Sequence, residues 1–380
     1  MQKLFAKIDE LNNFYIGVWK DICAIDSPTA YKEGVDRVGD YLIKLARERG
    51  FEIKILENEI AGNALAITIN PDCKENPVVF SGHIDTVFPT GTFPSPTVTT
   101  DDEKIYGPGV MDCKGGVVAS FMALDALSQC GFKSRPVKLI VQSDEETSSL
   151  QSGKKTIEFM IDESKSAAAF LNTEGTQGNT AVIERKGILR YRFNITGKAV
   201  HSSKCHNGAN AICEAAHKII KLEQMKDVDG LTCNCGIIEG GTVANTVAEK
   251  CSFTADIRFA NNRQYDEAVR ICEETAKQST ISGCSCELVK VSERPAMPLC
   301  DKNIDLLYKM NEIYKSCGLP TLEKLFGEGG SDAAYTTQAD IPTVDSIGVD
   351  GGDIHSIREY ARLDSLSECA KRLAAVAFKL

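Results

Sequence analysis

Two histidines and three carboxylates in this sequence stand at the ends of predicted strands or in the turns beside them. They are His83, Asp112, Glu146, Glu174 and His355. In open α/β sheets, ligands bind in the crevice outside the carboxyl ends of the strands, so we expect these side chains to converge on one edge of a sheet. Imidazole and carboxylate donors together suit zinc, with manganese or cobalt as alternatives.

Asp112 is the central residue of this prediction. It lies in the Gly/Pro-rich stretch from Tyr106 to Gly116, immediately before a run with the apolar spacing of a helix. We predict that Asp112 is shared between two metal ions. The formal charges of three carboxylates, two divalent cations and one bridging hydroxide sum to zero, whereas the same carboxylates without metal would repel one another.

Asp85 and Glu145 are neighbours of the predicted ligands. His83 and Asp85 are two residues apart, so both project to one side of an extended segment, where Asp85 can fix the second ring nitrogen of His83. In Asp144-Glu145-Glu146, consecutive carboxylates point in different directions, so one can bind metal while its neighbour remains a base. The alternatives are a structural histidine for His83 and a solvated turn for the acidic run.

Length and composition narrow the class of protein. With 380 residues and 43% hydrophobic residues, the chain is long enough for two domains with apolar cores. A net charge of −10 argues against a nucleic-acid partner, and we find no run of about 18 apolar residues that would span a membrane. Fifteen cysteines, an odd number in a chain without a secretory signal, predict reduced thiols and a cytoplasmic location.

The order of predicted elements indicates an α/β protein with an insertion. To about residue 175, strands alternate with helices, including one over about 149–162, which implies a largely parallel sheet covered on both faces. From about residue 187, a β-α-β-β-α-β order of about 110 residues is the signature of a ferredoxin-like unit. We therefore predict a catalytic domain over 1–186 and 295–380, with an inserted domain over 187–294.

Five motifs in this order resemble those of the co-catalytic di-zinc peptidase and deacylase family. That family includes glutamate carboxypeptidase, acetylornithine deacetylase, succinyl-diaminopimelate desuccinylase and aminoacylase. The motifs are Ser-Gly-His83-Ile-Asp85-Thr, Gly-Pro-Gly-Val-Met-Asp112-Cys-Lys-Gly-Gly, Asp-Glu145-Glu146, Glu174-Gly and a late His355. The resemblance runs from about residue 15 to the C-terminus. It implies a three-layer zinc-exopeptidase-like catalytic domain, with the ferredoxin-like α+β insertion as a lid and dimerisation domain.

By position, the resemblance also implies a role for each site residue. It makes Asp112 the ligand that bridges two zinc ions and Glu145 the general base. The remaining ligands divide into two pairs, one for each ion: His83 with Glu174, and Glu146 with His355.

Three residues of the insertion resemble the family's substrate contacts. His201 looks like the residue that reaches the partner subunit's site and stabilises an oxyanion, so the resemblance implies a homodimer. Asn245 and Arg258 look like the residues that hold the substrate, and the planar fork of Arg258 suits a free carboxylate. The alternatives are a surface turn for His201 and a strand-end salt bridge for Arg258.

The resemblance implies hydrolysis of an amide bond next to an amino acid with a free carboxylate, in a small peptide or an N-acyl amino acid, by zinc-activated water. The motifs are closest to the carboxypeptidase. However, Glu174 occurs in deacylases of the acetylornithine deacetylase or succinyl-diaminopimelate desuccinylase type, whereas the carboxypeptidase has aspartate there. The acyl group is therefore open. A non-catalytic metal-binding protein is the third alternative, disfavoured because the base and all ligands are present.

Overall fold

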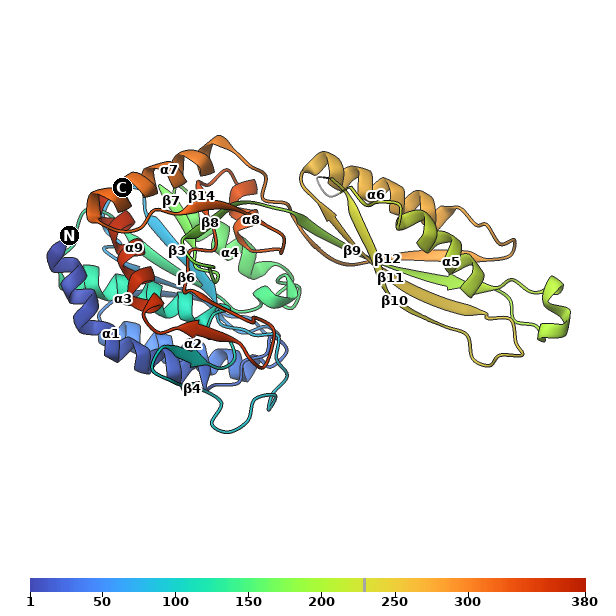
Figure 1. Cartoon of the computed structure of the whole chain (residues 1–380), viewed down its shortest axis with the longest axis horizontal. Helices are drawn as coiled ribbons and strands as arrows, with labels where there is room; N and C mark the ends of the chain where they lie inside the picture. Colours follow the sequence, from blue (N-terminus) through green and yellow to red (C-terminus); the bar gives the residue numbers. More distant parts are fainter. Residues whose placement is uncertain (228–229) are drawn as a thin grey trace. The chain divides into compact units, whose positions relative to one another are not determined.

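The computed structural model describes residues 1–227 and 230–380 (Figure 1). The chain forms two compact units. The first contains Met1–Ile183, Leu299–Phe326 and Tyr335–Leu380, and the second contains Glu184–Pro298 and Gly327–Ala334. Within the described residues, no helix has both the length and the apolar character needed to cross a membrane.

The first unit is built on a six-stranded sheet in the order β1-β2-β6-β3-β7-β14. Its strands are β1 (Glu52–Leu56), β2 (Ala64–Ile69), β3 (Val78–His83), β6 (Val137–Gln142), β7 (Ala169–Asn172) and β14 (Thr343–Val344). The four strands from β6 to β14 are parallel, whereas β1 and β2 join by antiparallel pairing. The prediction of a largely parallel sheet is therefore confirmed.

Helices cover both faces of this sheet. They are α1 (Gln2–Cys23), α2 (Lys32–Glu48), α3 (Lys114–Gln129), α4 (Lys155–Ser164), α7 (Asp301–Cys317), α8 (Ala333–Gln338) and α9 (Ser365–Lys379). On one face, α1, α3 and α9 pack together over the sheet (Figure 1). On the other, Ile157 and Met160 of α4 pack against Val79 and Ile140. Strands buried on both faces appear in sequence as continuous apolar runs, which is why they could be recognised.

Helix α4 begins later than the predicted helix over about 149–162. Ser148, Ser149 and Lys154 have positive φ angles of 58°, 55° and 71°. Such left-handed backbone cannot continue a right-handed helix, so the segment before Lys155 is a series of turns. The helix predicted from apolar spacing therefore begins about six residues too early.

Two small sheets were not predicted. β4 (Thr99–Thr100), β5 (Lys104–Tyr106), β15 (Gly351–Gly352) and β16 (Tyr360–Arg362) form one, in the order β15-β16-β5-β4. β8 (Thr180–Arg185) and β13 (Glu323–Gly327) form the other. In the first, Tyr360 pairs with Tyr106 and Arg362 with Lys104. This pairing joins the segment just before Asp112 to the segment just after His355.

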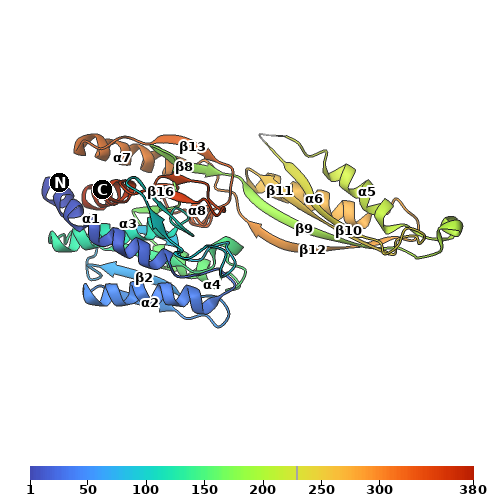
Figure 2. The same cartoon turned by 60° about the horizontal axis from the view of Figure 1, so that its bottom comes forward.

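The second unit has the predicted β-α-β-β-α-β order. It contains β9 (Gly187–Thr196), α5 (Ala211–Leu222), β10 (Thr232–Gly240), β11 (Lys250–Phe259), α6 (Asn262–Lys277) and β12 (Ser285–Arg294). The antiparallel sheet has the order β10-β11-β9-β12, and α5 and α6 pack on one face (Figure 1 and Figure 2). Alternate residues of β9 and β11 point into this core, where the rings of Phe193 and Phe253 stack at 4.6 Å.

Candidate metal centre and active site

Three neighbouring parallel strands carry site residues at their carboxyl ends. β3 ends at His83, with Asp85 two residues later. β6 is followed by a short 3₁₀ helix, Glu145–Thr147, and β7 by the loop that carries Glu174. Because β6, β3 and β7 lie side by side in this order, the loops meet at one edge of the sheet, as expected from the general rule for such folds.

Asp112 lies between two histidines from distant parts of the chain. Its Oδ1 atom is 3.0 Å from Nε2 of His83, and its Oδ2 atom is 3.1 Å from Nε2 of His355. The two oxygens of one carboxylate thus face two different imidazoles. This is the arrangement that a bridging ligand requires.

A second carboxylate accompanies each histidine. Oε1 of Glu174 lies 3.6 Å from Nε2 of His83, and Oε2 of Glu146 lies 3.4 Å from Nε2 of His355. The cluster therefore has two halves, each with one imidazole, one carboxylate of its own and one oxygen of Asp112. All five predicted ligands are brought together.

Asp85 is fully buried beside this cluster and fixes its surroundings. Its backbone carbonyl oxygen lies 3.1 Å and its Oδ1 atom 3.3 Å from Nδ1 of His83, on the side of the ring away from Asp112. Its carboxylate accepts hydrogen bonds from the backbone N–H groups of Glu145 and Glu146 and from the hydroxyl of Thr29. Asp85 therefore sets both the orientation of His83 and the position of the acidic segment.

Burial favours the protonated form of Glu174 and Glu146 when no cation is present, but Asp112 stays ionised. Burial raises the pKa of Glu174 to about 8 and that of Glu146 to about 7, because a charged carboxylate is poorly solvated there. Burial also opposes ionisation of Asp112, but hydrogen bonds with His355 and His83 outweigh it and lower the pKa of Asp112. Hydrogen bonds with Asp112 and Glu146 raise the pKa of His355 to about 10.

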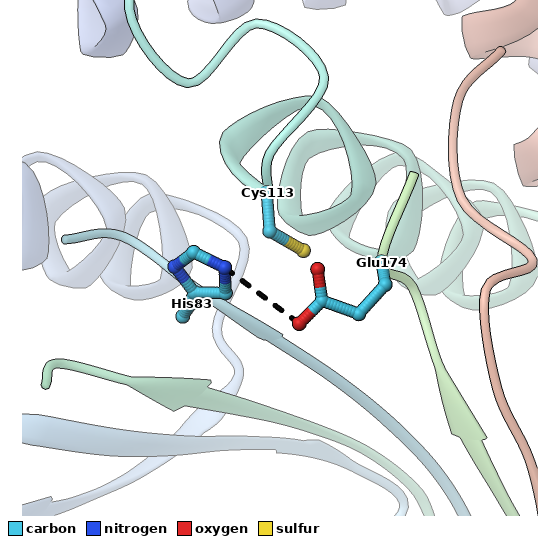
Figure 3. Close-up of side chains that lie close together, drawn as sticks. All are labelled: His83, Cys113 and Glu174. Atoms are coloured by element: carbon cyan, nitrogen blue, oxygen red, sulfur yellow. Dashed lines mark ion pairs between the residues drawn. The ribbon is translucent and has the colours of Figure 1, made fainter. Parts of the chain in front are cut away.

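Cys113 lies against one half of the cluster. The donor atoms of His83, Cys113 and Glu174 all lie within 4.8 Å of one another, and Figure 3 shows the three side chains converging. The buried Sγ–H donates to the carbonyl oxygen of Thr173 at 3.1 Å, and burial raises the pKa of the thiol. The thiol is therefore a protonated hydrogen-bond donor in this arrangement.

A close approach between α3 and β7 makes this geometry feasible. A Cβ atom on Gly116 would lie 1.9 Å from the carbonyl oxygen of Thr173, the residue before Glu174. Only glycine fits there without moving the backbone. The Gly-Gly pair after Asp112 thus lets the first turn of α3 contact the end of β7.

The donor set fits a divalent metal. Two imidazoles and three carboxylates are the ligand types that zinc and related ions take. Cations would also neutralise the negative charge of three carboxylates that are buried close to one another.

Comparisons with known proteins show the family to which this chain belongs. The model of peptidase family M20/M25/M40 matches residues 79–379. The chain belongs to this family. It is 27% identical over 351 residues to carboxypeptidase G2 of Pseudomonas sp. (strain RS-16), covering 90% of this chain and 83% of that relative. It is 26% identical over 286 residues to succinyl-diaminopimelate desuccinylase of Rickettsia felis, covering 70% and 74%.

Solved structures share the fold. A tripeptidase from Staphylococcus aureus superposes with a TM-score of 0.78 at 22% identity, covering 95% of this chain and 96% of that chain. An M20 family metallo-carboxypeptidase from Sulfolobus solfataricus gives a TM-score of 0.75 at 16% identity, covering 96% and 98%. The chain is thus a hydrolase of the M20 metallopeptidase family, and its predicted fold class is confirmed.

The second unit of this M20 protein carries the other three predicted residues. His201 and Asn245 lie together, because the N–H of Ser202, the residue after His201, donates to the carbonyl oxygen of Asn245. Both side chains are exposed, and His201 accepts a hydrogen bond from the N–H of Ser203 at the start of a 3₁₀ helix (Ser202–Asn207). The surface turn considered for His201 is therefore present.

Arg258 lies at the other end of the second unit's sheet. It is eight residues along β11 from Lys250, where the Asn245 loop enters the strand, which corresponds to about 26 Å at about 3.3 Å per residue. Its Nε atom donates to Asp256 at 2.7 Å, and Arg190 binds the same carboxylate. The strand-end salt bridge is thus observed, and one chain does not bring Arg258 to His201 and Asn245.

Glu359 is a site residue that sequence reasoning missed. Its carboxylate is buried and accepts hydrogen bonds from the backbone N–H groups of Gly109, Met111 and Asp112. Burial raises its pKa to about 7. The only signal in the sequence is a glutamate four residues after His355, in a segment without periodicity.

Proposed function

We propose that this protein is a zinc-dependent exopeptidase that cleaves the amide bond next to an amino acid with a free carboxylate. The observation that carries the proposal is the position of Asp112 between His83 and His355, with one carboxylate oxygen towards each. The identity to carboxypeptidase G2, over 90% of this chain, supports the carboxypeptidase-like substrate.

We assign two zinc ions to the cluster, with cobalt or manganese as substitutes. Asp112 would bridge them, and each ion would take one half of the cluster: His83 with Glu174, and His355 with Glu146. Asp85 would orient the His83 ring through its second nitrogen. When bound, the cations supply Lewis acidity to the amide carbonyl and make a water molecule acidic.

Glu145 is assigned as the general base. Its backbone N–H is held by Asp85 Oδ1 at 3.2 Å, and its side chain is mostly buried next to the ligand Glu146. A carboxylate there can take the proton of the attacking water and give it to the leaving amine. Such proton transfer needs a base that is fixed in place, which the Asp85 contact supports.

We assign the carboxylate end of the substrate to Arg258 and Asn245, and the developing oxyanion to His201. Within one chain, Arg258 is separated from Asn245 and His201 by most of the length of β11. We therefore propose a homodimer in which His201 and Asn245 act on the site of the partner. This assignment gives residues 187–294 the role of lid and dimerisation domain, and residues 1–186 and 295–380 the role of catalytic domain.

Exposed apolar side chains support a dimer through this insertion. Ile237 and Ile238 lie on β10, an edge strand of its sheet, and Ile212 and Ile220 lie on the neighbouring helix α5. Edge strands with apolar side chains are prone to pair with another chain. The fifteen cysteines, all within the described residues, are free thiols, which supports the proposed cytoplasmic location.

An N-acyl-amino-acid deacylase is the second candidate. It is favoured by Glu174, where the resemblance associates glutamate with deacylases, and by the identity to succinyl-diaminopimelate desuccinylase. The same site residues would perform the same chemistry, so only the acyl group distinguishes the two functions.

One substrate panel tests both functions. Zinc-loaded protein is assayed with dipeptides, benzoyl- and acyl-glutamates, acetylornithine and succinyl-diaminopimelate, with and without a chelator. Chelator-sensitive cleavage that is fastest for glutamate-terminated substrates supports the exopeptidase. Preference for acetylornithine or succinyl-diaminopimelate supports the deacylase. Absence of metal-dependent cleavage across the panel would contradict both.

A further inference from the structure

Glu359 connects two segments that are far apart in the sequence. Its Oε1 atom accepts hydrogen bonds from the N–H groups of Met111 at 2.9 Å and Asp112 at 3.0 Å, and its Oε2 atom accepts one from Gly109 at 3.3 Å. Asp112 and Glu359 are separated by 247 residues. A glutamate side chain that is 1% exposed thus binds three backbone donors of a single loop.

The backbone around Glu359 strengthens the same connection. The carbonyl oxygen of Glu359 accepts the N–H of Gly107 at 3.3 Å. Strand β16, which begins at the next residue, pairs with β5, which leads directly into this loop. Four residues before Glu359 is His355, whose Nε2 atom lies 3.1 Å from Oδ2 of Asp112. Glu359 therefore connects the loop that carries Asp112 to the segment that carries His355, and both of these are predicted metal ligands.

A carboxylate is the side chain that this position requires. An ionised carboxylate offers acceptor sites only, and hydrogen bonds to a charged group are stronger than those between neutral groups. A glutamine has the same shape, but its NH₂ group would face backbone N–H donors. On the side where the NH₂ group lies, two hydrogen-bond donors would then face each other, and no hydrogen bond could form.

We propose that Glu359 is a positioning residue for metal binding: it fixes the backbone of Asp112 relative to His355, so that each oxygen of the bridging carboxylate faces its own imidazole. The inference rests on the proposed function in one respect, namely that the cluster binds divalent metal. Partners that orient metal ligands typically contribute about 10- to 100-fold to metal affinity.

The experiment compares two buried glutamates. Glu214 in the second unit is fully buried and accepts hydrogen bonds from the backbone N–H groups of Thr280 and Ile281. It lies outside the catalytic and metal-binding machinery, so E214Q controls for the loss of a buried carboxylate that binds backbone. For wild type, E359Q and E214Q, the measurements are zinc stoichiometry, zinc affinity by chelator competition, and the absorption spectrum of the cobalt form.

We expect E359Q to raise the zinc dissociation constant about 10- to 100-fold and to change the cobalt spectrum. E214Q should lower thermal stability yet leave both metal readouts at wild-type values. If E359Q loses stability but binds zinc with wild-type affinity and spectrum, Glu359 is merely structural and the inference is overturned. If wild type itself binds no divalent metal, the proposed function fails instead.

A second variant covers the case in which E359Q does not fold. E359D retains the charge but is one methylene shorter, so it cannot reach all three N–H groups without moving the loop. We expect it to weaken zinc binding by at least about 3-fold and to shift the cobalt spectrum, in the direction of E359Q. Wild-type affinity and spectrum in E359D would also overturn the inference.

Discussion

The carboxylate of Asp85 accepts a hydrogen bond from the backbone N–H of Glu145 at 3.2 Å. The same Oδ1 atom lies 3.3 Å from Nδ1 of His83. One buried side chain therefore contacts both a predicted metal ligand and the residue proposed to move protons. Because Asp85 holds the backbone of Glu145, changes to the Glu145 side chain should leave this framework in place.

Replacing Glu145 by glutamine should lower kcat by about 100- to 10,000-fold, the usual contribution of a general base. The amide keeps the size of the side chain and leaves the backbone contact with Asp85 intact. Zinc stoichiometry and thermal stability should therefore stay near wild type. Steady-state kinetics and elemental analysis on the same preparation provide the measurements.

The matched control is E158Q, which changes an exposed glutamate on α4. It should retain wild-type kcat. If E145Q retains more than about a tenth of wild-type kcat, a loss smaller than general-base removal predicts, Glu145 is not the base.

The metal-free protein should lose stability as pH rises from about 5.5 to 8.5. The folded pKa values of Glu146, Glu174 and His355, about 7, about 8 and about 10, lie above their ordinary values of 4.5, 4.5 and 6.5. Groups with raised folded pKa values stabilise the fold while protonated, so their contribution disappears as pH rises through those values. Asp112, whose pKa is lowered, is already ionised throughout this range.

Thermal unfolding of chelator-treated protein across this pH range is the measurement. We expect the midpoint to fall by about 2 °C, equivalent to about 1–2 kcal/mol for a chain of this size. Zinc should remove most of the pH dependence, because bound cations replace the protons. A metal-free midpoint that rises with pH would contradict the pKa directions.

The residues proposed as metal ligands, which the structure brings together, could be recognised in the sequence because each is adjacent to a clear signal. His83 and Glu174 follow apolar strands, and Asp112 lies between a Gly/Pro turn and an apolar helix. Glu359 had no such signal, because β15 and β16 are two and three residues long and too short to show periodicity. Hydrogen bonds between residues 247 positions apart cannot be read from spacing alone.

The separation of Arg258 from His201 was equally hidden in the sequence. Both residues were recognised by their motifs. Arg258 stands near the carboxyl end of β11, but where His201 lies relative to it depends on how β9 and β11 pair. The antiparallel register of β9 and β11 places Arg258 opposite Ile188 and Lys250 opposite Thr196. The two residues are thus assigned to opposite ends of the sheet only by the folded structure.

The loops that carry the predicted ligands also expose apolar side chains. Each lies within four residues of a site residue: Val87, Leu150, Ile354 and Ile357. The basic side chains on these loops already have partners. Lys154 donates to the carbonyl oxygen of Ser148 and to the hydroxyl of Tyr335, and Arg358 lies 3.6 Å from Asp353. From these side chains we expect an uncharged, apolar acyl group to be preferred over a succinyl group.

I357S should lower kcat/KM for benzoyl- or hexanoyl-glutamate about 10-fold, the effect of losing one apolar contact. It should change acetyl-glutamate hydrolysis by less than about 2-fold, because the acetyl group has little apolar surface to bury. The control is I304S, at an exposed isoleucine of α7, which should change neither. Faster hydrolysis of succinyl- than of benzoyl-substrates by wild type would contradict this prediction.

Two inactive variants should restore activity when combined, if His201 serves the partner's site. H201A lacks the proposed oxyanion donor, and E145Q lacks the proposed base. In a mixed dimer, the H201A chain supplies an intact Glu145 and receives His201 from the E145Q chain, so one of the two sites is complete. Random reassortment makes half of the dimers mixed, and about a quarter of all sites active.

Activity is measured after the two variants are mixed, partly unfolded in denaturant and refolded together, with each variant treated alone as the control. Recovery to about a quarter of wild-type kcat supports exchange of His201 across the dimer. In a second arm, I220D is added to both variants and, separately, to wild type. It should block recovery of activity in the mixture and shift the sedimentation of the otherwise wild-type protein towards monomer. Y308D, at a similarly exposed side chain of α7, should do neither. Mixtures that remain as inactive as their components, despite dimers in sedimentation, would place His201 in the site of its own chain.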